Sequence, residues 1–144
     1  MKKPSPLPDV QLQAEAFRQA RQARRAELSE DYVELISSLL ANGGEARQVD
    51  IAERLGVAQP TVARMLKKMI EDGLVQRKPY RGIFLTDAGR HMAAQSRTRH
   101  EIVEKFLLSL GIDAETALRD AEGIEHHVSA RTLEAFRKFL ERGH

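Results

Sequence analysis

The sequence contains no cysteine among its 144 residues. A disulfide framework, a thiolate zinc site and a thiol nucleophile are therefore excluded. No apolar run approaches the roughly 20 residues that a membrane helix needs, and the first residues, Met1 to Pro4, lack the apolar core of a signal peptide. With 42% hydrophobic and 31% charged residues, the chain can bury a core, and we expect a cytoplasmic protein that does not contact a membrane.

The sequence also lacks a glycine-rich phosphate loop, an internal repeat and a nucleophile placed directly after a strand. Its patterning is mainly helical, and a small helical protein offers little room for a substrate pocket. We therefore expect no enzymatic activity and no small organic substrate.

Charge is distributed unevenly along the chain, although the net charge is only +2. Residues 64–81 contain six basic and two acidic side chains, whereas residues 91–144 contain eight basic and nine acidic ones. This asymmetry predicts that the middle of the chain faces nucleic-acid phosphates and that the C-terminal third has another task.

The pattern divides the chain into four segments. Residues 1–10 hold several prolines and lysines and predict a disordered tail. Residues 11–28 predict an N-terminal extension helix with small apolar side chains, and Ser29 predicts the N-cap of a separate helix. Residues 29–86 and residues 87–144 predict two further domains, and the motifs that they carry indicate what each one does.

The extension helix carries four arginines, Arg18, Arg21, Arg24 and Arg25. Three interpretations remain open for it: an arm that contacts DNA, a contact across a dimer, and a loosely packed surface helix.

The middle of the chain has the pattern of a helix-turn-helix. A short amphipathic helix over residues 49–55 ends at Gly56, and Pro60 precedes a second helix over residues 61–71. Residues 74–85 then predict two short strands joined by a turn. A helix-turn-helix followed by a hairpin is a winged helix, so we expect a mainly α protein with a winged helix-turn-helix and a helical module.

In such a domain, the second helix of the motif enters the major groove and its first residues meet base edges. Gln59 can pair with adenine, and Pro60 or Thr61 can contact a thymine methyl. Basic residues further along the helix and at the hairpin tip fit phosphate contacts. The predicted DNA-binding residues are Arg47, Gln48, Gln59, Pro60, Thr61, Arg64, Lys67, Lys68, Arg77, Lys78 and Arg81.

A second group of residues has the chemistry of a metal site. Glu122, Glu125 and His126 are spaced i, i+3, i+4 within a helix predicted over residues 113–127, so we expect them to share a face. Carboxylates with some imidazole suit manganese or ferrous iron. Spacing alone also allows a solvated helix face. The candidate metal ligands are Asp31, Glu34, His100, Glu122, Glu125 and His126.

Several motifs have a family resemblance. Residues 31–34 (DYVE), 81–86 (RGIFLT) and above all 121–127 (AEGIEHH) resemble the manganese-responsive branch of the diphtheria-toxin-repressor family. The resemblance runs from about residue 30 to about residue 139. It implies a metal-dependent repressor that binds a palindromic operator as a homodimer and controls manganese-uptake genes.

The resemblance also implies the roles of the six candidate ligands. Asp31 and Glu34 match ligands on the first helix of the reading domain, His100 matches a ligand on the linking helix, and the other three match ligands on the next helix. His127 matches no direct ligand. The iron-responsive branch carries sulfur-bearing residues where this chain has Asp31 and Glu122. The resemblance therefore implies Mn(II) as co-repressor, with Fe(II) as the alternative, and leaves the number of ions open.

The C-terminal helices carry more apolar side chains than a lone module of this size can cover, which predicts a two-fold dimer that presents two reading helices. The candidates for the covered surface are Ile102, Phe106, Leu107, Leu133, Phe136, Phe139 and Leu140. Three alternatives remain open: an iron-responsive member of the same family, a winged-helix regulator gated by an organic effector, and a metal buffer or chaperone.

Overall fold

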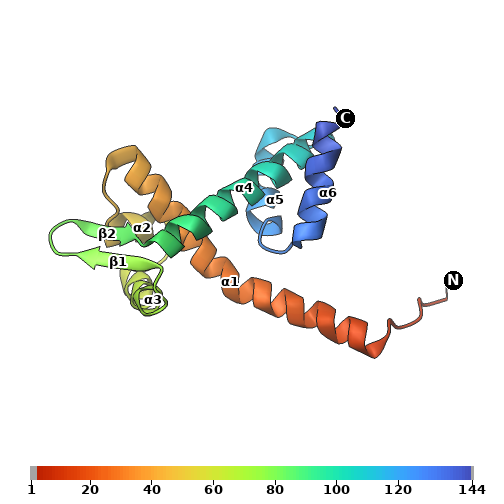
Figure 1. Ribbon diagram of the computed structural model, residues 1–144, viewed down its shortest axis with the longest axis horizontal. Helices are drawn as coiled ribbons and strands as arrows, with labels where there is room; N and C mark the ends of the chain where they lie inside the picture. Colours follow the sequence, from red (N-terminus) through yellow and green to blue (C-terminus); the bar gives the residue numbers. More distant parts are fainter. Residues whose placement is uncertain (1–2, 144) are drawn as a thin grey trace.

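The computed structural model describes residues 3–143 and is mainly helical, with one small hairpin (Figure 1). A winged helix-turn-helix lies at one end and a helical module at the other, which confirms the predicted fold class. The elements are α1 (Val10–Gly43), α2 (Gln48–Leu55), α3 (Gln59–Glu71), β1 (Val75–Lys78), β2 (Gly82–Leu85), α4 (Asp87–Ser109), α5 (Ala114–Ile124) and α6 (Ala130–Glu141).

Helix α1 is one continuous helix of 34 residues, so the predicted helix start at Ser29 is wrong. The N-cap is Asp9, whose side chain accepts hydrogen bonds from the backbone N–H groups of Gln11 and Leu12. No proline or glycine interrupts the helix before Gly43, and a single serine inside a helix costs little. Of the tail predicted over residues 1–10, residues 3–9 have no regular structure and the first two lie outside the described residues.

The C-terminal half of α1 forms the core of the reading domain together with α2, α3 and the hairpin. Apolar side chains repeat at helical spacing on each helix and meet in one cluster, which confirms the helix-turn-helix. The buried side chains are Tyr32, Val33, Ile36, Ile51, Val62, Leu66, Met69, Val75, Ile83 and Leu85.

Strands β1 and β2 pair antiparallel and form the wing, with Val75 opposite Leu85. The N–H of Ile83 donates to the carbonyl of Ala46 at 2.8 Å, which fixes the wing to the loop before α2. Gly82 has φ +91°, and a Cβ there would lie 2.7 Å from that carbonyl oxygen, so the approach requires glycine.

Helix α4 links the two ends of the molecule. Thr86 caps it: its Oγ1 accepts a hydrogen bond from the N–H of Gly89 at 3.1 Å and donates to the carbonyl of Gly73 at 2.6 Å. A Cβ on Gly89 would lie 2.1 Å from the carbonyl oxygen of Leu74. The first turn of α4 is therefore pressed against the chain that enters the wing.

Helices α5 and α6 pack on the C-terminal half of α4 (Figure 1). The rings of Phe106 and Phe136 stack with centroids 4.0 Å apart, and Phe139 meets Phe106 edge-on at 5.4 Å. Helix α5 ends at Ile124, so the helix predicted over residues 113–127 is too long by a turn. Within residues 3–143, no helix is both long and apolar enough to span a bilayer.

Candidate metal centre and DNA-binding surface

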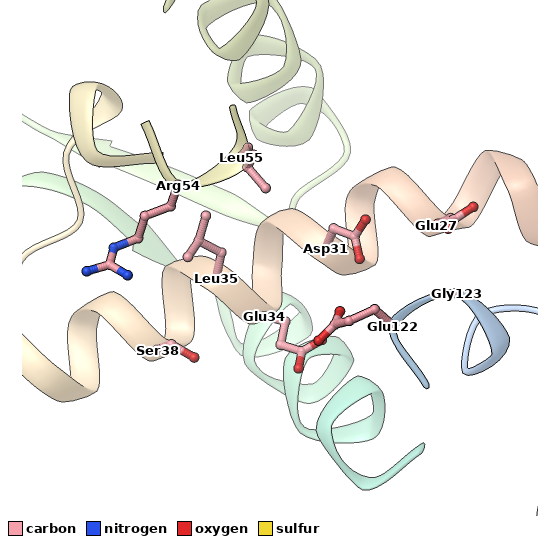
Figure 2. A pocket seen from close by; sticks show the side chains of 9 residues that line it. All are labelled: Glu27, Asp31, Glu34, Leu35, Ser38, Arg54, Leu55, Glu122 and Gly123. Carbon is pink, nitrogen blue, oxygen red and sulfur yellow. The ribbon is translucent and has the colours of Figure 1, made fainter. Parts of the chain in front are cut away.

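The six candidate ligands converge where α1, α4 and the C-terminal end of α5 meet. Figure 2 shows the carboxylates of Glu34, on α1, and Glu122, on α5, turned toward each other across the pocket. The pocket is a cleft of about 560 Å³ that Asp31 also lines. Carboxylates from α1 and α5 therefore line one cleft, and the imidazoles of His100 and His126 contact two of them, Glu122 and Asp31.

The buried ring of His126 forms one half of the centre. Its Nε2 lies 2.9 Å from Oδ1 of Asp31, and its Nδ1 lies 2.5 Å from Oε2 of Glu30. Glu27, Asp31 and His126 can each offer a ligand atom within 4.8 Å of the other two. Sequence reasoning missed Glu27 because a separate helix was predicted to start at Ser29, and it missed Glu30 because the partners of Glu30, His126 and Arg99, come from distant segments.

His100 forms the other half of the centre. Its Nδ1 lies 3.5 Å from Oε1 of Glu122 and 3.5 Å from Oε2 of Glu125, while its Nε2 lies 2.9 Å from Oε2 of Glu104. The three side chains of His100, Glu122 and Glu125 can also offer ligand atoms within 4.8 Å of one another. Of the three residues expected on one helical face, only Glu122 lies within α5, since Glu125 caps that helix and His126 lies in the following turn.

Four buried polar atoms of this centre have no hydrogen-bond partner among the described residues. They are Nδ1 of His100, both carboxylate oxygens of Glu125, and Nε2 of His126, which lies only in ion-pair contact with the carboxylates of Asp31 and Glu125. Leaving a buried polar atom unpaired costs roughly 1–3 kcal/mol. A divalent cation would satisfy these atoms, so the residues present fit a metal ion.

The electrostatics of the centre favour a cation as well. Burial, together with the neighbouring carboxylates of Glu34 and Glu122, raises the pKa of Glu125 from 4.5 to about 9. Burial also raises the pKa of Glu122. Without a metal, Glu125 therefore holds a proton at neutral pH, and a divalent cation would replace that proton and relieve the repulsion.

Carboxylates of opposite charge surround the imidazole of His126. Burial lowers the pKa of this imidazole, but the carboxylates of Asp31 and Glu30 beside its two nitrogens outweigh burial and raise the pKa to about 10. The hydrogen bond to His126 lowers the pKa of Glu30. The ring is therefore cationic without a metal. It must lose a proton before Nε2 can bind a metal ion.

Side chains behind the ligands hold them in place. Arg99 donates to Glu30 at 3.4 Å, and Ser96 donates to Oε2 of Glu34 at 3.0 Å. His127, which matched no ligand, lies 3.4 Å from Glu27. Partners of this kind orient metal ligands in proteins. The sequence signal for Glu27 and Glu30 is their i, i+3, i+4 spacing with Asp31 along α1, which becomes visible only once the helix is known to be unbroken.

The ligand atoms are carboxylate oxygens and imidazole nitrogens, with no sulfur. Such a donor set suits Mn²⁺ or Fe²⁺ and disfavours cuprous copper or structural zinc. Metal bound here would join α1 of the reading domain to α4 and α5 of the C-terminal module.

The predicted DNA-binding residues on α3 lie on its exposed side. Gln59 and Pro60 form its first turn, and Arg64 donates to Oγ1 of Thr61 at 3.5 Å. Lys67 and Lys68 follow on the same exposed helix. The structure thus leaves the side chains of the reading helix accessible to a groove of DNA.

The remaining predicted contacts frame α3. Gln48, at the start of α2, donates to the carbonyl of Gln59 at 3.4 Å and accepts from Arg77 of β1 at 3.3 Å. Arg47 lies beside Gln48 and pairs with Glu45, Lys78 stacks on the ring of Phe84, and Arg81 is exposed at the tip of the wing. The starts of α2 and α3 and the wing therefore lie in one connected polar surface.

A winged helix-turn-helix attached to a module rich in carboxylates and imidazoles defines a metal-dependent DNA-binding regulator. Residues 26–83 match the family model described as the iron dependent repressor, N-terminal DNA binding domain, and residues 86–143 match its metal binding and dimerisation domain. The chain belongs to the iron-dependent repressor family. This confirms the family that the motifs predict. It also confirms the prediction of a transcriptional regulator rather than an enzyme.

The relatives point to one branch of that family. The chain is 57% identical to the transcriptional regulator MntR of Escherichia coli O157:H7, over 98% of this chain and 91% of that protein. It is 40% identical to the HTH-type transcriptional regulator MntR of Bacillus subtilis strain 168, over 73% of this chain and 74% of that protein.

Solved structures share the fold. The manganese regulator SloR is 32% identical, with a TM-score of 0.71 over 78% of this chain and 53% of that one. A manganese-dependent transcriptional repressor in complex with manganese is 30% identical, with a TM-score of 0.69 over 78% and 52%. The chain therefore spans about half the length of these solved relatives.

Proposed function

We propose that this protein is a metal-dependent transcriptional repressor that senses Mn(II), binds a palindromic operator as a homodimer and controls manganese-uptake genes. The observation that carries the proposal is the set of four buried ligand atoms that lack a hydrogen-bond partner among the described residues, at the junction of α1, α4 and α5. The regulators named MntR and the manganese-dependent solved repressor support manganese as the ion.

The ligands we propose come from both sides of the junction between the two domains. Asp31 and Glu34 lie on the helix that builds the reading core, and the others lie on α4 and at the end of α5. Glu27 is an added candidate because it clusters with Asp31 and His126. The proposed ligand set is Asp31, Glu34, His100, Glu122, Glu125 and His126.

Metal would gate DNA binding by holding α1 against the C-terminal module. Without it, the carboxylates repel one another, and the angle between the reading domain and the module is held less firmly. In a dimer this angle sets the spacing of the two α3 helices, which must fit half-sites about one helical turn apart. Such coupling between metal and DNA is typically worth about 1–3 kcal/mol.

Carboxylates at Asp31 and Glu122 support Mn(II) over Fe(II), since neither position offers a softer donor. We propose residues 29–86 as the DNA-binding domain and residues 87–144 as the metal-binding and dimerisation domain. Only His144 of the latter lies outside the described residues. A regulator of chromosomal genes works where the DNA is, which supports the cytoplasm as its location.

We propose that DNA is bound by the surface around α3 and the wing. Of the predicted residues there, all but the half-buried Gln48 are exposed. The proposed set is Arg47, Gln48, Gln59, Pro60, Thr61, Arg64, Lys67, Lys68, Arg77, Lys78 and Arg81.

The homodimer would form through the C-terminal module. The apolar residues proposed from the sequence, such as Phe106 and Phe136, are half-buried against one another within the chain. The exposed apolar side chains of the module lie instead around the end of α4 and on α5. They are Leu108, Leu110, Ile112 and Leu118.

The test is a fluorescence-anisotropy titration of a palindromic operator from a manganese-uptake promoter at one fixed salt concentration. Titrations run in chelator, with Mn²⁺, with Zn²⁺, and with Fe²⁺ under anaerobic conditions. We expect Mn²⁺ to tighten binding at least tenfold, and the double variant Glu122→Ala/His126→Ala to lose that gain.

The matched control is Glu101→Ala/His91→Ala, which removes the same residue types from exposed positions on α4. It should respond to Mn²⁺ as the unsubstituted protein does. Tight binding in chelator with no response to any metal would refute the proposal and favour an organic effector. A response to Fe²⁺ larger than that to Mn²⁺ would assign the chain to iron sensing.

A further inference from the structure

The N-terminal half of α1 extends beyond the reading domain as a helical arm, here residues 10–28 (Figure 1). Its side chains are mostly exposed, including Phe17 at 59% and Leu28 at 52%. With a rise of 1.5 Å per residue, the arm is roughly 28 Å long. An exposed helix of this length has few contacts within the chain, which leaves its surface available to a partner.

The arginines of the arm lie on one face. Arg18, Arg21 and Arg25 are spaced i, i+3 and i+7, and Arg24 lies beside them, so the four fall within an arc of roughly 120°. The opposite face carries small residues such as Ala23, which line a shallow hollow with His127 of the C-terminal module. The basic face therefore points away from that module.

None of these four arginines has an ion pair or hydrogen bond within the part of the chain that the structure describes. Several other arginines of the molecule do pair with nearby acids. They are Arg47 with Glu45, Arg90 with Asp87, Arg99 with Glu30, Arg119 with Glu115, and Arg137 with Glu134. The arm thus concentrates uncompensated positive charge, with Glu15 and Glu27 as its only acids.

The basic face continues into the DNA-reading surface. Leu28 lies on the arginine side of the helix, three residues after Arg25 and seven after Arg21. It lines a groove of about 440 Å³ together with Thr61 and Arg64 of α3. The arginines and the exposed side of α3 therefore face the same way.

We propose that the arm is a second DNA-binding element, which lies along the sugar-phosphate backbone beside the half-site that α3 reads. The inference rests on the proposed function, because α3 must first dock on DNA. At 3.4 Å per base pair, the length of the arm corresponds to roughly eight base pairs. Its arginines would bind phosphates without reading sequence.

A second copy of the chain is the other conceivable partner of this face. Four unpaired arginines on one arm would repel the same four on another, whereas DNA phosphates complement them. Charge therefore favours DNA.

The experiment compares the unsubstituted protein with the variant Arg18→Gln/Arg21→Gln/Arg24→Gln/Arg25→Gln. Affinity for the operator and for a non-operator duplex is measured with Mn²⁺ at several salt concentrations. Each lost phosphate contact reduces the magnitude of the negative slope of log K against log salt by about 0.9. For a dimer with two arms, the loss of at least one contact per arm should reduce that magnitude by about 1.8 or more, with weaker binding of both duplexes.

The control removes the same charge from four exposed basic residues of α4 and α6, as Arg97→Gln/Lys105→Gln/Arg131→Gln/Arg142→Gln. Its slope should match that of the unsubstituted protein. All substituted side chains are exposed, so folding is preserved, and light scattering at the working concentration gives the mass of each variant.

An arm variant with an unchanged slope and affinity would overturn the inference while leaving the metal-gated repressor intact. Loss of the dimer in the arm variant, with an unchanged slope per bound protomer, would also overturn it and assign the arm to a second copy. If the unsubstituted protein ignored Mn²⁺, the proposed function would fail, but the slope on the non-operator duplex would still decide the role of the arm.

Discussion

Oε2 of Glu30 lies 2.5 Å from Nδ1 of His126, and this contact joins two residues 96 positions apart. It fixes the ring so that the other nitrogen, Nε2, faces Asp31 and the cleft. Arg99 holds Glu30 from behind at 3.4 Å. The chain Arg99, Glu30, His126 thus orients one proposed ligand before any metal arrives.

Substituting Glu30 should weaken metal binding although Glu30 is not itself among the proposed ligands. We expect Glu30→Ala to reduce Mn²⁺ affinity by roughly 10- to 100-fold, the usual cost of losing such a partner. Glu30→Gln should cost less, because its side-chain oxygen can still accept from Nδ1. Free Mn²⁺ measured by electron paramagnetic resonance gives the affinity. Glu53→Gln, at an exposed position on α2, is the control, and equal Mn²⁺ affinity in Glu30→Ala would contradict an orienting role.

The metal-free protein should lose stability as pH rises, and Mn²⁺ should oppose that loss. The pKa values of Glu125 and His126 are raised in the fold, from 4.5 to about 9 and from 6.5 to about 10. A raised pKa gives stability that is complete below the ordinary value and is lost as pH rises through the folded value. Mn²⁺ replaces these protons, so it binds more tightly as pH rises.

The measurement is thermal unfolding by circular dichroism in chelator and in Mn²⁺, from pH 6 to pH 8.5 under argon. The gap in Tm between the two conditions should widen as pH rises. In Glu125→Gln the metal-free curve should be flatter, since its titrating carboxyl is gone. A gap that stays constant across this range would count against proton release from the centre.

The sequence was informative wherever a local pattern determined the structure. Gly56 and Pro60 delimit the helix-turn-helix, and the repeated apolar residues of α3 define its buried side. These features depend on neighbours within a few residues, so composition and spacing are enough to predict them.

Patterns could not place partners that come from distant segments. Glu27 became visible as part of the candidate metal centre only because α1 runs unbroken through Ser29. Glu30 became visible only because the chain after α5 brings His126 to it. Glu125 and His126 were expected on a helical face, yet Glu125 caps α5 and His126 follows that cap. The ligand set itself came from family resemblance, since spacing alone leaves a solvated face equally open.

The exposed apolar residues at the end of α4 and on α5 predict where the dimer forms. Leu110 is 55% exposed and Leu118 is 47% exposed, and burying such side chains against a partner gains roughly 25 cal/mol per Å². We expect Leu110→Lys/Leu118→Glu to shift the protein toward monomers and to weaken operator binding. Light scattering across a range of concentrations measures the mass.

The control is Leu7→Lys, at an exposed site before α1, which should leave the dimer intact. An unaltered dimer in the double variant would place the interface elsewhere.

The contact between Gly89 and Leu74 predicts how the two domains are held together. A Cβ at position 89 would lie 2.1 Å from a backbone oxygen that belongs to the entry of the wing, and backbone cannot move aside as a flexible side chain can. Gly89→Ala should therefore cost about 1–3 kcal/mol of unfolding free energy, as overpacking typically does. It should also tilt α4 against the wing and so weaken metal-dependent operator binding more than metal binding itself.

Gly43→Ala is the control: its Cβ would meet nothing within 4 Å, and its stability should stay within about 1 kcal/mol of the unsubstituted protein. Urea unfolding gives both free energies, and equal stability of the two variants would mean that this close approach does not set the position of α4.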